Sequence, residues 1–246
     1  MNKDGFWALI DKVNAEAKNA GHAEVLELTE KLLLELPSSE IADWHSIQKE
    51  YANMAYRNDL WAACSAITGR CSDDGFIDFR SWLISRGHDM YVAALQSPDS
   101  LAKYDFTFSE VEFENYGYVA AYAYAKKVLI EAGGPESVEQ QYQLWWSENA
   151  EKITAQFEQK GLPEAEQRQY LDRWFQSYLT IQHDVYKAAE QNPLSKECLA
   201  SIRLERPTKP DIGSNWMMDD LPEIVPELYA KYNSPDMMTV YSVHVF

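Results

Sequence analysis

Apolar residues recur at helical spacing through the first 70 positions. Phe6, Trp7, Ile10 and Val13 share one face of an expected helix, for which Asp4 is the predicted N-cap. Pro37 and Gly69 lie where later apolar stripes stop, as helix-ending residues do. The pattern predicts four helices in this part of the chain, over residues 4–21, 25–34, 38–51 and 58–67.

The same spacing returns in the second half of the chain. An apolar face from Phe113 to Leu129 predicts a helix, and Gly133, Gly134 and Pro135 mark a boundary after it. Two long amphipathic segments follow, over 138–161 and 163–185, and predict a helical hairpin. Aromatic and branched residues over 106–113 are expected to form a loop.

From Pro193 onward, six prolines interrupt any long helix, so this segment is expected to wrap the surface or to stay mobile. Its last apolar residues are expected to dock, as a short strand: Val240, Tyr241, Val243, Val245 and Phe246. The predicted fold class is therefore all-α, in three segments: a multi-helix domain over 1–132, the hairpin over 133–192 and the proline-rich tail over 193–246.

The stretch Cys71–His88 concentrates unusual residues between two expected helices. Its centre resembles an EF-hand loop, but with Gly75 at the sixth position a cation, Arg70, occupies the first ligand position, and Ser81 occupies the last. Only Asp74 and Asp78 are carboxylates in ligand positions, which is too few for a good calcium site. No metal is expected here.

A helix start explains the same stretch more simply. Asp73 or Asp74 is the predicted N-cap, and Gly87 is the predicted stop. The charged side chains then remain available to a partner or ligand. The candidate binding residues are Asp73, Asp74, Asp78, Arg80, Trp82 and Arg86.

The chain resembles a known family in several segments. These are Phe6-Trp7 with Leu9-Ile10-Asp11, Leu60–Ala63, Cys71–Phe76 continuing to Gly87, and Pro98–Leu101. Together they resemble the bacterial domain-of-unknown-function family 4240 over about residues 5 to 125. The resemblance implies a domain boundary near residue 130, and it implies no activity.

Charge limits the choice of partner. The 39 acidic and 22 basic residues give a net charge of −17, so phosphate backbones and anionic membranes are repelled at long range. The longest basic run is Lys126-Lys127, so we expect neither nucleic acid nor membrane as a partner. A basic protein would be attracted to this chain.

Other chemistry has little support in the sequence. Three cysteines without a Cys-x-x-Cys pair fit a reducing cytoplasm, and the first residues lack the apolar core of a signal peptide. No common phosphate-binding, dinucleotide, hydrolase or zinc-protease motif is present, and no cofactor is expected. A thiol nucleophile would require Cys71 to meet His88.

We therefore expect a non-catalytic acidic protein that binds a basic protein, such as an inhibitor or immunity protein against a basic toxin or effector. The alternative is an enzyme or small-ligand-binding domain with its site in the Cys71–His88 stretch. The sequence leaves the oligomeric state open.

Overall fold

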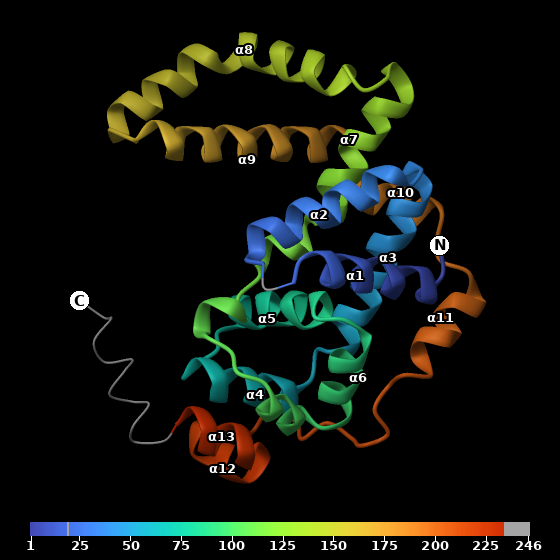
Figure 1. Ribbon diagram of the computed structural model, residues 1–246, viewed down its shortest axis with the longest axis vertical. Coiled ribbons are helices and arrows are strands. Elements are labelled where there is room, and N and C mark those ends of the chain that lie inside the picture. Colours follow the sequence, from blue (N-terminus) through green and yellow to red (C-terminus); the bar gives the residue numbers. More distant parts are fainter. Residues whose placement is uncertain (19, 234–246) are drawn as a thin grey trace. The chain divides into compact units, whose positions relative to one another are not determined.

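The structure is a computed structural model that describes residues 1–18 and 20–233 (Figure 1). These residues contain helices and no strand, which confirms the all-α prediction. The α-helices are α1 (Lys3–Glu16), α2 (His22–Glu35), α3 (Ser38–Met54), α4 (Asn58–Thr68), α5 (Asp73–Ser85), α6 (His88–Gln96), α7 (Val119–Gly133), α8 (Ser137–Lys160), α9 (Glu164–Gln182), α10 (Val185–Gln191), α11 (Lys196–Arg203), α12 (Leu221–Ile224) and α13 (Pro226–Tyr232). Short 3₁₀ helices are η1 (Pro98–Lys103), η2 (Phe108–Glu110), η3 (Glu114–Gly117) and η4 (Met218–Asp220).

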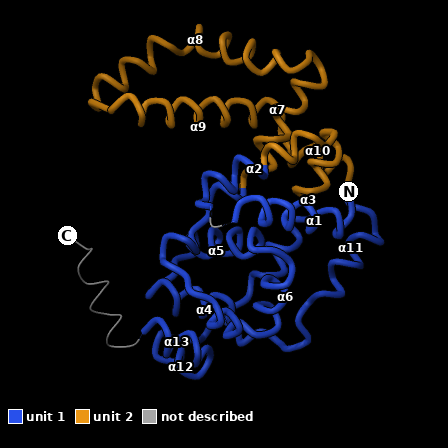
Figure 2. The backbone as a smooth tube through the Cα atoms, viewed as in Figure 1, with its two compact units in different colours: residues 1–29, 46–117, 194–246 blue, residues 30–45, 118–193 orange. Residues whose placement is uncertain are grey.

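The chain divides into two compact units (Figure 2). Unit 1 comprises residues 1–29, 46–117 and the described part of 194–246, and unit 2 comprises 30–45 and 118–193. These bounds follow spatial contacts and differ from the three sequence segments, because α2 and α3 each contribute residues to both units. The predicted segment boundaries stay a prediction.

Large aromatic side chains fill the core of unit 1. Phe6 of α1, Tyr51 of α3 and Tyr91 of α6 are fully buried, and the Phe6 and Tyr51 rings stack with centroids 5.5 Å apart. Phe76 and Phe79 of α5 are also fully buried. Burial of such rings supplies much of the apolar stabilisation of a small domain.

Buried polar groups join segments of unit 1 that are distant in sequence. The Tyr91 hydroxyl donates to the Tyr51 carbonyl at 2.6 Å, and the Gln48 side-chain amide donates to the Tyr116 carbonyl at 3.0 Å. A buried polar group costs free energy unless it is hydrogen-bonded, so these pairs favour one arrangement of the helices.

The segment after Pro193 packs along unit 1 through short helices. Asp211 accepts the backbone N–H groups of Asn58 and Asp59 at the start of α4, at 2.9 and 3.3 Å. In return, Asp99 of η1 accepts the N–H groups of Glu227 and Leu228 at the start of α13, at 3.1 and 2.9 Å. Carboxylates at helix N-termini satisfy orphan donors and complement the helix dipole. The residues expected to dock at the end of the chain, Val240, Tyr241, Val243, Val245 and Phe246, lie outside the described residues.

Unit 2 contains the predicted hairpin of α8 and α9. Trp145, Ile153 and Phe157 of α8 pack with Phe175 and Leu179 of α9 in one buried cluster. This is the apolar stripe that the helical spacing predicts. The hairpin core also includes Ala125 of α7.

None of the described helices is long and apolar enough to cross a membrane.

Two predicted helix caps are wrong. The N-cap of α1 is Asn2, whose side-chain oxygen accepts the Gly5 N–H at 2.9 Å, so Asp4 lies in the first turn. The N-cap of α5 is Ser72, whose hydroxyl accepts the Gly75 N–H at 3.0 Å. In both cases a residue one or two positions earlier has extended backbone and reaches the third helical N–H, which leaves the aspartates to interact with the helix dipole.

Candidate functional site

Helix α5 carries five of the six predicted site residues and ends just before the sixth, Arg86, but it does not bring them together. Asp73 and Asp74 are exposed in its first turn, and Arg86 is exposed just after its last residue. A helix of this length separates its ends by roughly 20 Å. The predicted residues therefore divide between an acidic end, a buried middle and a basic end.

The acidic end holds four carboxylates from two segments. Asp74 and the half-buried Asp78 of α5 lie near Glu112 and Glu114, which follow η2 and begin η3. We call these four residues the acidic cluster. Burial, together with the charges of Glu114, Glu112 and Asp74, raises the pKa of Asp78 to about 6. Among the described residues, none of the four forms an ion pair.

The buried middle of α5 contains Arg80, which holds α3 in place. Its Nη1 donates to the Ala52 carbonyl in the last turn of α3 at 2.8 Å, and its Nε donates to the Phe76 carbonyl at 3.2 Å. The guanidinium lies 4.7 Å from the centre of the Tyr56 ring, within cation–π range. Burial lowers the pKa of Arg80. Arg80 is thus used inside the fold.

Trp82 is buried beside Arg80 on the same helix. Its ring meets Phe79 at 5.3 Å and meets the edge of Phe106 at 4.8 Å between centroids. Trp82 thereby connects α5 to the loop that follows η1. Of the six predicted residues, Arg80 and Trp82 pack in the core, while Asp73, Asp74 and Arg86 are exposed and Asp78 is half-buried.

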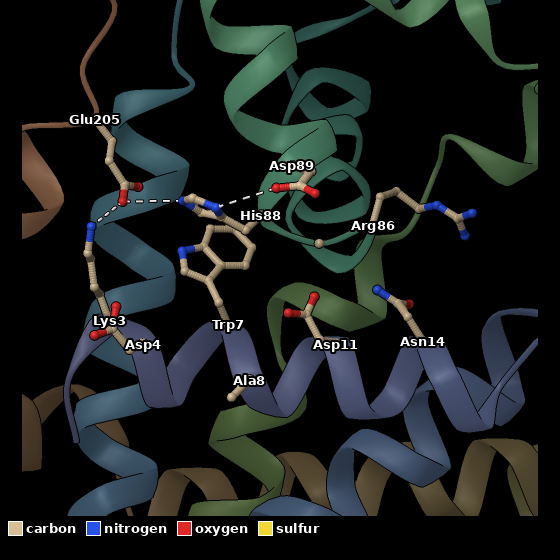
Figure 3. A pocket seen from close by; sticks show the side chains of 11 residues that line it. Lys3, Asp4, Trp7, Ala8, Asp11, Asn14, Arg86, His88, Asp89 and Glu205 are labelled. Atoms are coloured by element: carbon tan, nitrogen blue, oxygen red, sulfur yellow. Dashed lines mark hydrogen bonds and ion pairs between the residues drawn. The ribbon is translucent and has the colours of Figure 1, made fainter.

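A polar cleft of about 470 Å³ lies at the basic end of α5, between α1 and the start of α6 (Figure 3). Gly87 forms its turn with φ of 98°, a conformation that favours glycine, and a Cβ there would stand 3.3 Å from Oδ1 of Asp11. We call this the α1–α6 cleft. Its lining residues are Lys3, Asp4, Trp7, Ala8, Asp11, Asn14, Arg86, Gly87, His88, Asp89 and Glu205.

Glu205, which follows α11, is the central residue of this cleft. Lys3 donates to Oε1, the Tyr51 hydroxyl donates to Oε2 at 2.9 Å, and Nε2 of His88 lies 3.2 Å from Oε1. Burial opposes ionisation of Glu205, but the bonds from Lys3 and Tyr51 and the charge of His88 outweigh it, so its pKa lies below the usual range. Burial and the Glu205 charge raise the pKa of Tyr51.

His88 is held between a carboxylate and an aromatic ring. Its ring meets Trp7 edge-on with centroids 5.2 Å apart, and its Nδ1 lies 3.9 Å from Oδ1 of Asp89. Figure 3 shows Lys3, Trp7, His88 and Glu205 directed toward one another, whereas the Arg86 side chain extends away from His88. An imidazole oriented by a carboxylate and half-exposed to a cleft can exchange a proton with a bound ligand.

The pairing of Cys71 with His88 that a thiol nucleophile requires is not formed. Cys71 precedes α5 and His88 begins α6, so the whole of α5 separates them. The Cys71 thiol instead contacts Cys64 of α4, whose pKa is raised by burial and by that contact. Within residues 1–18 and 20–233, no group of histidine, cysteine and acidic side chains is arranged to hold a metal ion.

Sequence reasoning missed Lys3, Trp7 and Glu205 as residues of a cleft. Trp7 was assigned to a helix core, which is correct for most of its ring, since only 5% of the residue is exposed. Glu205 lies 202 positions from Lys3, and nothing local in the sequence joins them. One signal was available, because the family-like segments Phe6–Asp11 and Cys71–Gly87 both border this cleft.

Comparisons with known proteins agree with the resemblance seen in the sequence. The family described as "Protein of unknown function (DUF4240)" matches residues 1–126, which is half of the chain. No curated protein and no solved structure matches the chain. The chain therefore belongs to the DUF4240 family of proteins of unknown function.

Proposed function

We propose that this protein is a non-catalytic acidic protein that binds a basic protein partner, as an inhibitor or immunity protein binds a basic toxin or effector. The observation that carries the proposal is the acidic cluster, in which the pKa of Asp78 is raised to about 6 by burial and three neighbouring carboxylates. A fold that keeps such charges together without a cation of its own loses stability there. A lysine or arginine from a partner would relieve the repulsion.

The charge of the whole chain supports the same proposal. A net charge of −17 attracts a basic protein at long range and accelerates encounter, while it repels nucleic acid and anionic membranes. The three cysteines, all within the described residues, are free thiols, as proteins of a reducing cytoplasm usually have. We therefore place the encounter in the cytoplasm.

Affinity purification of the tagged protein from its own cells tests the proposal, with the retained proteins identified by mass spectrometry at low and moderate salt. The triple variant Asp74→Asn, Glu112→Gln and Glu114→Gln removes three exposed charges of the acidic cluster. The matched control, Asp219→Asn, Glu223→Gln and Glu197→Gln, removes three exposed charges from the segment after Pro193.

The expected result is one stoichiometric basic protein that the parent and the control retain, that the cluster variant loses, and that leaves as salt rises. Equal retention by all three proteins would show that the cluster is not the contact. Where a basic partner is captured as expected, loss of its activity on titration with the parent chain would establish inhibition.

A second candidate function is an enzyme or a small-ligand-binding domain with its site at the end of the Cys71–His88 stretch. The observation that favours it is His88, oriented by Glu205 in an open polar cleft. Arg80→Ala is a poor test because this change also removes the hydrogen bond to α3. His88→Asn is the better variant, and His183→Asn, the same change at a histidine that does not line this cleft, is its matched control.

Thermal-shift screening of small molecules separates the two candidates. A ligand that stabilises the parent and His183→Asn but not His88→Asn would favour the second candidate. A ligand that stabilises all three equally would place its site elsewhere.

A further inference from the structure

A second cavity of unit 1 brings basic and aromatic side chains together. Its volume is about 840 Å³, within the size range of small-molecule sites. It lies where the end of α5 meets the loop after η1, and we call it the Tyr104 pocket. Arg86, Lys103 and His22 supply its basic groups, and Trp82, Tyr104 and Phe106 supply its aromatic rings.

Arg86 and Lys103 are both exposed, and neither forms an ion pair with any residue that the structure describes. The two carboxylates of the pocket are already engaged. Glu110 accepts the N–H and the hydroxyl of Thr107 at 2.6 and 2.7 Å, and Asp105 pairs with Lys231 at 2.7 Å. Besides the hydrogen bonds from Thr107, Arg86 is close enough to Glu110 to help lower the pKa of that carboxyl, but neither cation of the pocket is held in an ion pair among the described residues.

Aromatic rings form one wall of the pocket. The Tyr104 and Phe106 rings are stacked, with centroids 5.9 Å apart and planes 28° from parallel, and Phe106 forms a T-shaped pair with Trp82. Tyr104 is 42% exposed. Such a wall can stack against a planar ring and gain free energy from contact area and ring geometry.

The wall is held in place from outside. The Tyr232 hydroxyl of α13 accepts the Phe106 N–H at 2.9 Å and donates to the Tyr104 carbonyl at 3.3 Å. Lys231 of the same helix donates to the Ala102 carbonyl at 2.9 Å and to the Tyr104 carbonyl. A wall fixed before binding lowers the entropic cost of taking up a ligand.

We propose that the Tyr104 pocket binds a small anion that carries an aromatic ring, with the phosphate or carboxylate on Arg86 and Lys103 and the ring against Tyr104 and Phe106. A polyanion such as nucleic acid is repelled by the field of the whole chain, whereas a small anion is exposed mainly to charges within about 10 Å, which here are Arg86 and Lys103 together with Asp105 and Glu110. Arg86 presents the planar donor fork that matches phosphate and carboxylate oxygens.

This inference rests neither on binding of a basic protein nor on the α1–α6 cleft, because the Tyr104 pocket is a separate cavity. Isothermal titration calorimetry of the full chain at low salt tests it with two probes, adenosine 5′-monophosphate and salicylate. Adenosine alone and inorganic phosphate alone report the ring and the anion separately. We expect at least one of the two probes to bind. If adenosine 5′-monophosphate binds, adenosine and phosphate should each bind with an affinity at least tenfold lower.

The variant Arg86→Gln with Lys103→Gln removes both cations and is expected to weaken binding at least tenfold. The matched control Lys12→Gln with Arg203→Gln removes two exposed cations that do not line the pocket, and it should bind as the parent does. Circular dichroism checks that each variant is folded.

Absence of binding by both probes at millimolar concentration would overturn the proposal. So would equal weakening by the two double variants, because this would be an effect of net charge alone. Phosphate binding as tightly as adenosine 5′-monophosphate would also contradict it, since the ring would then contribute nothing. The acidic-cluster triple variant should still bind the small-molecule probe. A failure of the proposed protein binding can therefore be distinguished from a failure of the Tyr104 pocket proposal.

Discussion

Two half-buried carboxylates of unit 1 have pKa values shifted in opposite directions, although burial raises both. Asp78, at the acidic end of α5, lies among other carboxylates, and its pKa is raised to about 6. Glu205, in the α1–α6 cleft at the other end of α5, accepts from Lys3 and Tyr51 and lies 3.2 Å from His88, and its pKa is lowered. The ionised form of a carboxyl group is thus favoured in Glu205 and disfavoured in Asp78.

The difference separates a structural charge from one available for binding. Glu205 joins four segments of the chain, because Lys3 begins α1, Tyr51 lies on α3 and His88 begins α6. Asp78 and its neighbours in the acidic cluster form no ion pair within the described part of the chain. Replacing Glu205 should weaken the fold. Replacing Asp78 should strengthen the fold and weaken binding of the partner.

The largest effect is expected for Glu205→Gln. The variant loses the charge that Lys3 and His88 face, at a cost of about 2 kcal/mol in the free energy of unfolding. For a chain of this length that corresponds to a melting temperature lower by about 4 to 8 °C. Thermal unfolding followed by circular dichroism measures it, with exposed Glu197→Gln of α11 as the control. An unchanged melting temperature would mean that Glu205 is not a structural charge.

A smaller loss is expected for Asp211→Ala. This side chain accepts N–H groups of Asn58 and Asp59, so it performs the capping role at the start of α4. Loss of a helix cap costs about 1 kcal/mol. Asp219→Ala, an exposed position on the same segment, is the control for chemical denaturation. Equal stability of both variants would show that Asp211 does not anchor the segment.

Asp78→Asn is expected to stabilise the protein at pH 7, by about 0.5 kcal/mol because solvent screens a half-buried group. The variant removes a negative charge that Glu112, Glu114 and Asp74 oppose. Chemical denaturation measures the change, and Asp219→Asn is the control. A destabilised Asp78→Asn protein would break the contrast with Glu205.

The stabilities of Asp78→Asn and Glu205→Gln should differ from that of the parent protein in opposite directions, and each difference should disappear as pH falls. The folded pKa of Asp78 lies above its unfolded value, so its cost is fully present above about pH 6 and disappears as pH falls toward 4. The advantage of Asp78→Asn should therefore vanish across this window. The folded pKa of Glu205 is depressed, so its contribution persists to about pH 4 and is lost below it. Denaturation of both variants between about pH 3 and pH 8 covers both windows and compares the two slopes.

Local spacing was sufficient to predict most helices and the hairpin. The stripe of Trp145, Ile153 and Phe157 packs as its period requires, and the span of α4 agrees with the expected one. Caps were less predictable, because Asn2 and Ser72 compete with nearby aspartates for the same N–H groups and only backbone geometry decides between them.

The candidate sites were predictable only in part. The sequence indicated Asp74 and Asp78 as binding residues, but the cluster also needs Glu112 and Glu114, which reach α5 through the packing of η3. Arg80 looked like a surface charge because its hydrogen bond to Ala52 depends on how α3 and α5 cross. Glu205 was missed because its partners lie on α1, α3 and α6.

The most direct test is a titration of side-chain carboxyl groups in the free protein, followed by nuclear magnetic resonance from pH 3 to pH 8. The account predicts that Asp78 titrates near pH 6 and that Glu205 titrates below the usual value for a glutamate, about 4.3. Triple replacement of Asp74, Glu112 and Glu114 should move the Asp78 midpoint down. A midpoint for Asp78 near 4 in the parent protein would contradict the account, because the acidic cluster would then carry no repulsion for a basic partner to relieve.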